Sequence, residues 1–145
     1  DLQNPDAKMS KSADTEAGLL KILDDPAVTA KKVMRAVTDA DGEIRFDRAN
    51  KAGVSNLLTI FSVLSGRSVD DLVAEYAGGG YGTLKKDLAE QVTASFTPIR
   101  ERTLELLADP AELDRILSKA ADRASEVADK TLAAVYNRVG LLPRS

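Results

Sequence analysis

The sequence predicts an all-α fold, in which short helices follow a mobile loop and lead into a long antiparallel helix pair. Alanine and leucine are abundant, and both residues favour helix over sheet. Apolar residues recur at the spacing of one helix face along most of the chain. Two Asp-Pro pairs, at 25–26 and 109–110, are typical of helix starts, because aspartate caps a helix and proline fits its first turn.

The composition excludes several kinds of chemistry. The 145 residues contain no cysteine, which removes disulfides, thiolate nucleophiles and zinc–thiolate sites. They contain no histidine either, so acid–base catalysis would need carboxylates or lysine. The net charge of −3 gives no global basic field, so any contact with nucleic acid requires local basic patches. No apolar run approaches the ~20 residues that cross a bilayer, and no signal peptide is evident, so we expect a cytoplasmic protein without a membrane partner.

The chain is expected to begin with a mobile loop over residues 1–12, because Asn4-Pro5-Asp6 is typical of a turn. A first short helix is predicted over about 14–23, with Ser12 or Asp14 as its cap. Leucine and isoleucine in this stretch would give the helix an apolar side.

A second helix is predicted to begin at Asp25-Pro26 and to end before a loop at 38–43. Within that loop, Thr38-Asp39 could position the residues that follow, but the favoured interpretation is that it only caps the preceding helix. Residues 44–47 are expected to be briefly extended, without forming a sheet. The helix face that turns toward the core should contain four apolar residues: Ala30, Val33, Met34 and Val37.

The most apolar segment, 53–66, predicts a helix that is buried on most sides. A capping-box-like start at Ser68 predicts the helix that follows, whose core face should contain Val69, Leu72, Val73 and Tyr76. The three glycines 78–80 predict a break between helices rather than a phosphate cradle, because the flanking GK[ST] pattern is absent.

Two long helices, over about 83–108 and 111–139, are predicted to close the chain, and the short connection between them predicts an antiparallel pair. Pro98 should kink the first of them. Glu112 is expected to reach back as in a capping box, and Gly140 to end the second helix. The core-facing stripe of the second helix is predicted to contain Leu113, Ile116, Leu117, Ala120, Ala124, Val127, Thr131 and Val135.

The sharpest chemical signal is the run Lys8-Met9-Ser10-Lys11-Ser12 in the mobile loop. Lysine ammonium groups on such a loop can close over a polyphosphate as point charges, and serine hydroxyls can add hydrogen bonds. Negative charge builds up where a pyrophosphate leaves, so cations that meet this charge lower the barrier more than they tighten substrate binding. Taken alone, the run leaves a second interpretation open, which is a solvated lysine–serine loop.

The same run, KMSKS, is a signature of class I aminoacyl-tRNA synthetases, and the chain resembles the bacterial tryptophanyl-tRNA synthetase family over essentially its whole length. The other matching stretches are Leu2–Pro5, Lys31-Lys32, Ala36–Asp39, Gly53–Leu58, Leu64–Gly66, Tyr81-Gly82, Pro98–Arg102 and Glu112–Leu117. The family's other signature contains histidines and is missing here, because the chain has none. Since the sequence also starts at Asp1, in what resembles the middle of a loop, we expect the C-terminal part of a longer enzyme, starting at the KMSKS loop.

The resemblance implies ATP-dependent attachment of tryptophan to its tRNA through an aminoacyl-adenylate. It also implies that residues 1–12 end a catalytic domain and that 13–145 form an α-helical region that binds tRNA near its anticodon. Lys8 and Lys11 would be catalytic, holding the ATP triphosphate and stabilising the departing pyrophosphate. The implied ATP-binding set is Lys8, Met9, Ser10, Lys11 and Ser12. Mg²⁺ is expected with the ATP, although no carboxylate is marked as its ligand, and the intact enzyme would be a homodimer.

Four basic residues near one side of the last helix are the candidate tRNA contacts: Arg115, Lys119, Arg123 and Lys130. Acidic residues are interleaved with them, so a solvated helix face is the alternative. The tryptophan pocket would lie in the absent N-terminal domain, so we expect the 145-residue chain alone to make no tryptophanyl-adenylate. The competing hypothesis is a stand-alone helical RNA-binding or interaction module without catalysis.

Overall fold

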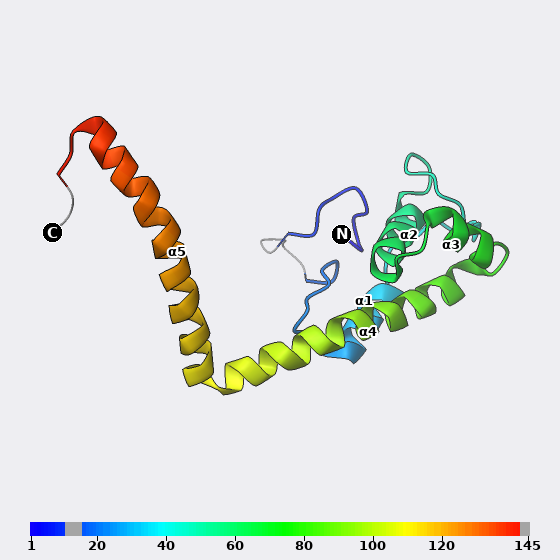
Figure 1. The fold of residues 1–145 in the computed structure, drawn as a ribbon. Helices are drawn as coiled ribbons and strands as arrows, with labels where there is room; N and C mark the ends of the chain where they lie inside the picture. Colours follow the sequence, from blue (N-terminus) through cyan, green and yellow to red (C-terminus); the bar gives the residue numbers. More distant parts are fainter. Residues whose placement is uncertain (11–15, 143–145) are drawn as a thin grey trace. The chain divides into compact units, whose positions relative to one another are not determined.

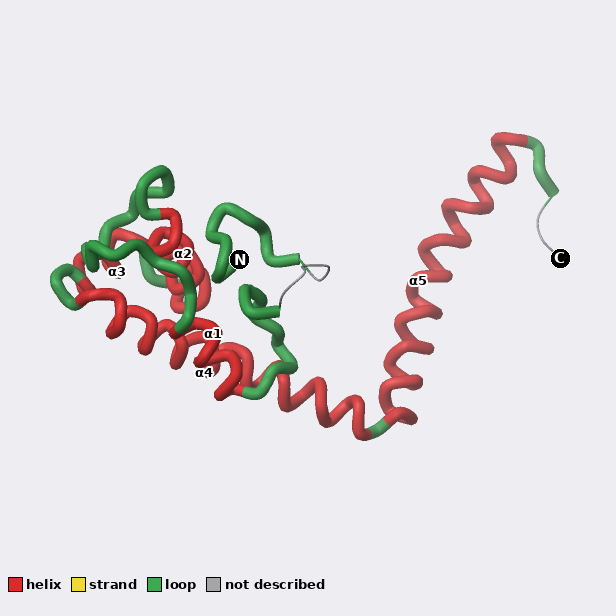
Figure 2. The backbone as a smooth tube through the Cα atoms, turned by 180° about the vertical axis from the view of Figure 1, so that it is seen from behind, coloured by secondary structure: helices red, strands yellow, loops and turns green. Residues whose placement is uncertain are grey.

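The computed structural model describes residues 1–10 and 16–142, and these residues form helices, turns and loops but no strand (Figure 2). The all-α prediction is therefore confirmed for this part of the chain. The helices, in chain order, are α1 (Pro26–Met34), α2 (Ala52–Ser65), α3 (Val69–Tyr76), α4 (Gly80–Ala108) and α5 (Pro110–Val139) (Figure 1). Contacts divide the chain into two compact units, residues 1–101 (unit 1) and 102–145 (unit 2). The functional division expected after residue 12 is a different one and stays a prediction.

The helix starts follow the local signals in the sequence. The Asp25 carboxylate accepts a hydrogen bond from the Ala27 N–H at 2.8 Å, and Ser68 caps α3 in the same way through the Asp71 N–H at 3.1 Å. Asp109 caps α5 by accepting from the Glu112 N–H at 3.1 Å. The expected return bond from the Glu112 side chain is not formed, because that carboxylate pairs with Arg115 instead. The capping-box prediction at Glu112 is therefore half right.

Unit 1 contains a single apolar core, centred on α2. Figure 1 shows α2 and α3 side by side, and the rings of Phe61 and Tyr76 join them with centroids 6.0 Å apart. One apolar residue of α2, Val63, is 77% exposed, so the helix is covered on most sides, as predicted, but not on all. The buried core residues are Leu2, Val33, Ala36, Ile44, Val54, Leu57, Leu58, Phe61, Leu72, Tyr76, Leu84, Leu88, Ala89 and Val92.

The helix predicted over 14–23 is not formed by its described residues, 16–23, which make turns. Residues 11–15, with the two proposed caps, lie outside the described residues. Two backbone carbonyl groups that such a helix would use accept hydrogen bonds from distant residues instead. The Gly18 carbonyl accepts from the Leu2 N–H at 3.0 Å, and the Leu19 carbonyl accepts from the Lys32 ammonium at 2.9 Å. Within the segment, the Leu19 N–H donates to the Glu16 carbonyl at 3.1 Å, which closes a turn, whereas the two carbonyls bond to distant parts of unit 1.

The face predicted for the second helix is only partly correct. Val33 is fully buried, but Met34 and Val37 are each 45% exposed. α1 ends at Met34, and the Val37 N–H donates to the Leu2 carbonyl at 2.8 Å instead of continuing the helix. The prediction fails at Val37 because this residue lies beyond the helix end, and at Met34 because the last residue of α1 is left uncovered.

Glycines make the predicted break between α3 and α4. Gly78 and Gly80 have positive φ angles of 77° and 70°, which residues with a side chain rarely adopt. α4 begins at Gly80, three residues before the predicted start, and continues through Pro98. The predicted break between the two helices is confirmed, and it is a tight turn.

The core-facing stripe predicted for α5 is wrong for this chain. None of the residues 110–139, all of which are described, is buried, and Leu117 and Val127 are 56% and 69% exposed. Gly140 does end α5, with a φ angle of 72°. The antiparallel pairing of the two long helices stays a prediction. Among the described residues, no helix has the length and apolar character needed to span a membrane.

Candidate functional site

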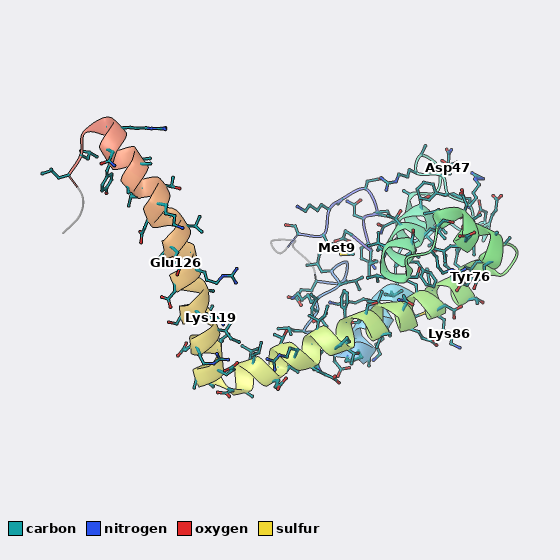
Figure 3. The ribbon with its side chains drawn as sticks, viewed as in Figure 1. Met9, Asp47, Tyr76, Lys86, Lys119 and Glu126 are labelled. Carbon is teal, nitrogen blue, oxygen red and sulfur yellow. The ribbon has the colours of Figure 1, made fainter. Side chains whose placement is uncertain are left out.

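The described part of the KMSKS run lies at the surface of unit 1. Lys8 and Ser10 are exposed, whereas Met9 is half-buried and packs against the core (Figure 3). Lys11 and Ser12 lie outside the described residues. Met9, Ser10, Leu19, Leu20 and Lys21 line a cavity of about 450 Å³. The lysine of this lining, Lys21, is paired with Glu16.

The segment that carries Lys8 is folded back on itself. The Ala7 N–H donates to the Asn4 carbonyl at 2.9 Å, which confirms the predicted turn around Pro5. The N-terminal ammonium of Asp1 donates to the Ala7 carbonyl at 2.6 Å, and the Gln3 N–H donates to the Asp1 carboxylate at 2.7 Å. These bonds fix the backbone of residues 1–7, directly before Lys8.

The same segment is attached to the helices of unit 1 at its start. Leu2 is 1% exposed and lies in the core. The Asn56 amide of α2 donates to the Asp1 carbonyl at 3.1 Å, and the Gln3 amide donates to the Arg35 carbonyl at 3.0 Å. A Cβ atom on Gly18 would lie 1.8 Å from the Asp1 carboxylate, so a side chain at this position would require the Asp1 side chain to move. The lysine-bearing segment is therefore an integral part of unit 1.

An ionic cluster around the buried Lys51, which the sequence did not predict, lies elsewhere in unit 1. Lys51 is 2% exposed, and its ammonium donates to Asp39 at 3.1 Å, to the Glu43 carbonyl at 3.0 Å and to the Tyr81 hydroxyl at 3.0 Å. It also donates to the Asp41 carboxylate. Asp39 thus joins the loop to α2 and α4. α1 already ends at Met34 with Arg35 as its C-cap, so the favoured prediction, that Thr38-Asp39 caps this helix, is wrong. The sequence feature that could have indicated this cluster is the position of Lys51, directly before the strongly apolar helix α2.

The cluster shifts the pKa values of its members. Burial opposes the charge on Lys51, but its hydrogen bonds with Asp41, Tyr81 and Asp39 outweigh burial and raise its pKa. The bond from Lys51 also holds the pKa of Asp41 well below 3.8. Burial, followed by the hydrogen bond with Asp39, raises the pKa of Tyr81 to about 12. All these shifts favour the charge states that keep the cluster together, so its role is structural rather than catalytic.

The candidate tRNA contacts are all exposed on α5. Arg115 is paired with Glu112 through two bonds of 2.7 Å. Figure 3 places Lys119 and Glu126 along the same helix, and positive and negative side chains alternate over its surface. The helix brings the four cations to the surface but gives them no acid-free patch.

Comparison with known proteins extends these observations. The tryptophan–tRNA ligase of Leifsonia xyli is 58% identical over 142 residues, which are 98% of this chain and 42% of that protein. The corresponding ligase of Bacillus subtilis is 46% identical over 140 residues, which are 97% of this chain and 42% of the relative. Among solved structures, the tryptophanyl-tRNA synthetase of Mycoplasma pneumoniae matches with a TM-score of 0.85 and 29% identity, over 99% of this chain and 45% of that chain.

The extent of these matches decides what they show. The chain spans less than half the length of the curated relatives that it matches. The family described as tRNA synthetases class I (W and Y) matches residues 1–97, which is more than half of the 145 residues. This match includes the KMSKS run and the core of unit 1. The chain therefore belongs to the class I tRNA synthetase family for tryptophan and tyrosine.

Proposed function

We propose that the chain works as the C-terminal part of a tryptophan–tRNA ligase, which attaches tryptophan to its tRNA with ATP through an aminoacyl-adenylate. The observation that carries this proposal is the sequence of the run 8–12, which follows directly on residues 1–7, a segment bonded to the helices of unit 1. The 58% identity to a ligase named for tryptophan supports that substrate over tyrosine. The activity belongs to the intact enzyme, because this chain lacks the family's histidine-containing signature.

The lysines provide the chemistry in this proposal. Lys8 and Lys11 hold the triphosphate of ATP and meet the negative charge that develops on the departing pyrophosphate. Ser10 and Ser12 donate hydrogen bonds to the same ligand, while Met9 fixes the loop against the core. The described residues contain no group of three acidic side chains that could hold a metal ion. We therefore assign Mg²⁺ to the phosphates of the ATP rather than to this chain.

The partners follow from the same assignment. Arg115, Lys119, Arg123 and Lys130 contact tRNA phosphates, within a region, residues 13–145, that binds the tRNA near its anticodon. The tryptophan pocket and the principal dimer surface of a homodimeric, cytoplasmic enzyme lie outside these 145 residues. By itself, the chain makes no tryptophanyl-adenylate.

A chimeric enzyme tests the proposal directly. The 142 matching residues of the Leifsonia xyli ligase are replaced by this chain, and tryptophan-dependent ATP–pyrophosphate exchange is measured. We expect exchange in the chimera and none in the 145-residue chain alone. Replacing Lys8 by Met in the chimera should lower the rate roughly a hundredfold, because one charge-stabilising donor is lost. Lys86→Met is the matched control, because Lys86 is an exposed lysine on α4.

The opposing results are equally clear. A folded chimera that exchanges no pyrophosphate would reject the ligase assignment and favour the stand-alone helical module. Equal rates for Lys8→Met and Lys86→Met would reject the role of Lys8 while leaving the ligase assignment intact.

A further inference from the structure

Residues 36–39, called the strap below, connect the lysine-bearing segment to the helices. On one side, the Val37 N–H of the strap donates to the Leu2 carbonyl at 2.8 Å. Leu2 is buried and lies six residues before Lys8, inside the folded segment described above. The position of the strap therefore fixes the start of the segment that carries Lys8.

On the other side, a lysine of α4 holds the strap. The Lys85 ammonium donates to the Ala36 carbonyl at 2.8 Å and to the Thr38 hydroxyl at 3.1 Å. Lys85 is half-buried, burial lowers its pKa, and its two bonds within the described residues go to neutral oxygens. Partial burial of a charge against neutral oxygens costs stability, and an apolar side chain would cover the same surface without that cost. Lys85 therefore contributes the position of the strap, which its two hydrogen bonds fix, rather than stability.

Contacts with α2 remove the remaining freedom of the strap. A Cβ atom on Gly53 would lie 2.3 Å from the Val37 carbonyl oxygen, so the α2 backbone touches the strap directly. The far end of the strap, Asp39, is held by Lys51 and Tyr81. Because the strap is held at several points, it cannot rearrange internally when the bonds from Lys85 are lost. The resulting displacement of Val37 therefore reaches Leu2 through their hydrogen bond.

We propose that Lys85 is a positioning residue for Lys8. It acts through Ala36, Val37 and Thr38 on the segment that carries this lysine. Lys85 itself does not touch the substrate. It fixes the position of Lys8, which binds the phosphates of ATP. The expected effect of Lys85 on the reaction rate rests on the proposed function. The expected effect on the position of the segment that carries Lys8 concerns this chain alone.

Hydrogen exchange on the 145-residue chain tests the structural half without using activity. In Lys85→Met, which keeps the apolar stem and removes the ammonium, the amides of Val37 and Leu2 should exchange about tenfold faster, since about one hydrogen bond of local protection is lost. The amide of Ser55 in α2 should be unchanged. Lys86→Met, on the next residue of the same helix, should change none of these rates (Figure 3). Thr38→Val, which removes only the hydroxyl, should give a smaller rise at the same two amides.

Kinetics of the chimera test the catalytic half. Lys85→Met should lower kcat for pyrophosphate exchange about tenfold, because a displaced catalytic group is costly. It should leave the KM for tryptophan and the affinity for tRNA unchanged, whereas a general loss of structure would alter all three. Lys85→Arg, which keeps the donors, should restore most of the rate.

Three results would overturn the proposal: equal exchange rates in Lys85→Met and Lys86→Met, a uniform rise at all amides of unit 1, or an unchanged kcat in an active chimera. An inactive chimera with the wild-type chain is a different result. It counts against the proposed function, whereas the exchange rates still decide whether Lys85 positions the segment.

Discussion

α2 is apolar on most sides and α5 has one apolar stripe, and the two helices have different surroundings. Leu57 and Leu58 of α2 are completely buried, whereas the apolar stripe of α5 is exposed along its length. The spacing of apolar residues is helical in both, and both helices form where the spacing predicts them. The comparison shows that periodicity identifies the face of a helix that requires cover, but not whether the chain itself provides the cover.

The charged residues of the two units differ in the same way. In unit 1, Lys51 gathers groups that lie 8 to 30 residues away along the chain. In unit 2, each ion pair joins residues three positions apart on the surface of a single helix. These pairs are Arg102–Glu105 on α4 and Arg115–Glu112 on α5. Exposed pairs at this spacing contribute little, because water and salt screen them. Unit 2 thus depends on intrinsic helix propensity and its caps, and unit 1 on packing.

The largest effect that follows from this comparison is in hydrogen exchange. Amides in the middle of α2 should exchange at least about a thousandfold more slowly than amides in the middle of α5, because only the former require opening of the core. Exchange of the 145-residue chain, followed residue by residue, measures the ratio. Equal protection in the two helices would break the comparison, since it would mean that another surface covers the stripe of α5 in solution.

Truncation of matched leucines should give the next largest difference. Leu57→Ala should reduce the free energy of unfolding by about 2–5 kcal/mol, because it leaves a cavity in the core. Leu117→Ala on α5, which is 56% exposed, should change it by less than about 0.5 kcal/mol. Chemical unfolding followed by tyrosine fluorescence, in a Tyr136→Phe background, reports on unit 1 through Tyr76 and Tyr81. A large loss at Leu117 would contradict the exposed state of α5.

Features controlled by neighbouring residues were predictable from the sequence. Asp25, Ser68, Asp109 and Gly140 act at helix ends as expected, because a cap depends on a few adjacent residues. The helix predicted over 14–23 failed where distant groups, such as Lys32, bind its carbonyls. Local propensity cannot show competition of this kind.

The candidate site shows the same limit. The KMSKS run is recognisable because its chemistry is contained in five consecutive residues. The contacts that place it are distributed over the chain: Lys85 binds Ala36 from 49 residues away, and Asn56 binds Asp1 from 55 residues away. No helical periodicity marks these polar residues. Their roles are visible only in three dimensions.

Two helical glycines provide a smaller but sharper test of the packing in unit 1. Gly53→Ala should lower the free energy of unfolding by about 1–3 kcal/mol, because the new methyl group collides with the Val37 carbonyl. Gly82→Ala on α4 should raise it by up to about 1 kcal/mol, since a Cβ atom there meets nothing within 4 Å and alanine favours helix. Thermal and chemical unfolding of both variants measure the difference. A neutral Gly53→Ala would mean that α2 and the strap are not in direct contact.

The smallest effect concerns the ionisation of Tyr81, which belongs to the cluster that distinguishes unit 1. Because the folded state raises the pKa of Tyr81 from 10.0 to about 12, the unfolded chain loses this proton first as the pH rises. The contribution of the hydroxyl to stability is therefore complete below pH 10 and is lost between about pH 10 and 12. The ultraviolet absorbance of tyrosinate in the wild type, minus that of Tyr81→Phe, isolates the titration of this one residue. A midpoint near 10 would show that Tyr81 is solvated and that Lys51 and Asp39 do not hold it. A midpoint near 12 would place the hydroxyl inside the buried cluster, where it joins the start of α4 to the loop before α2.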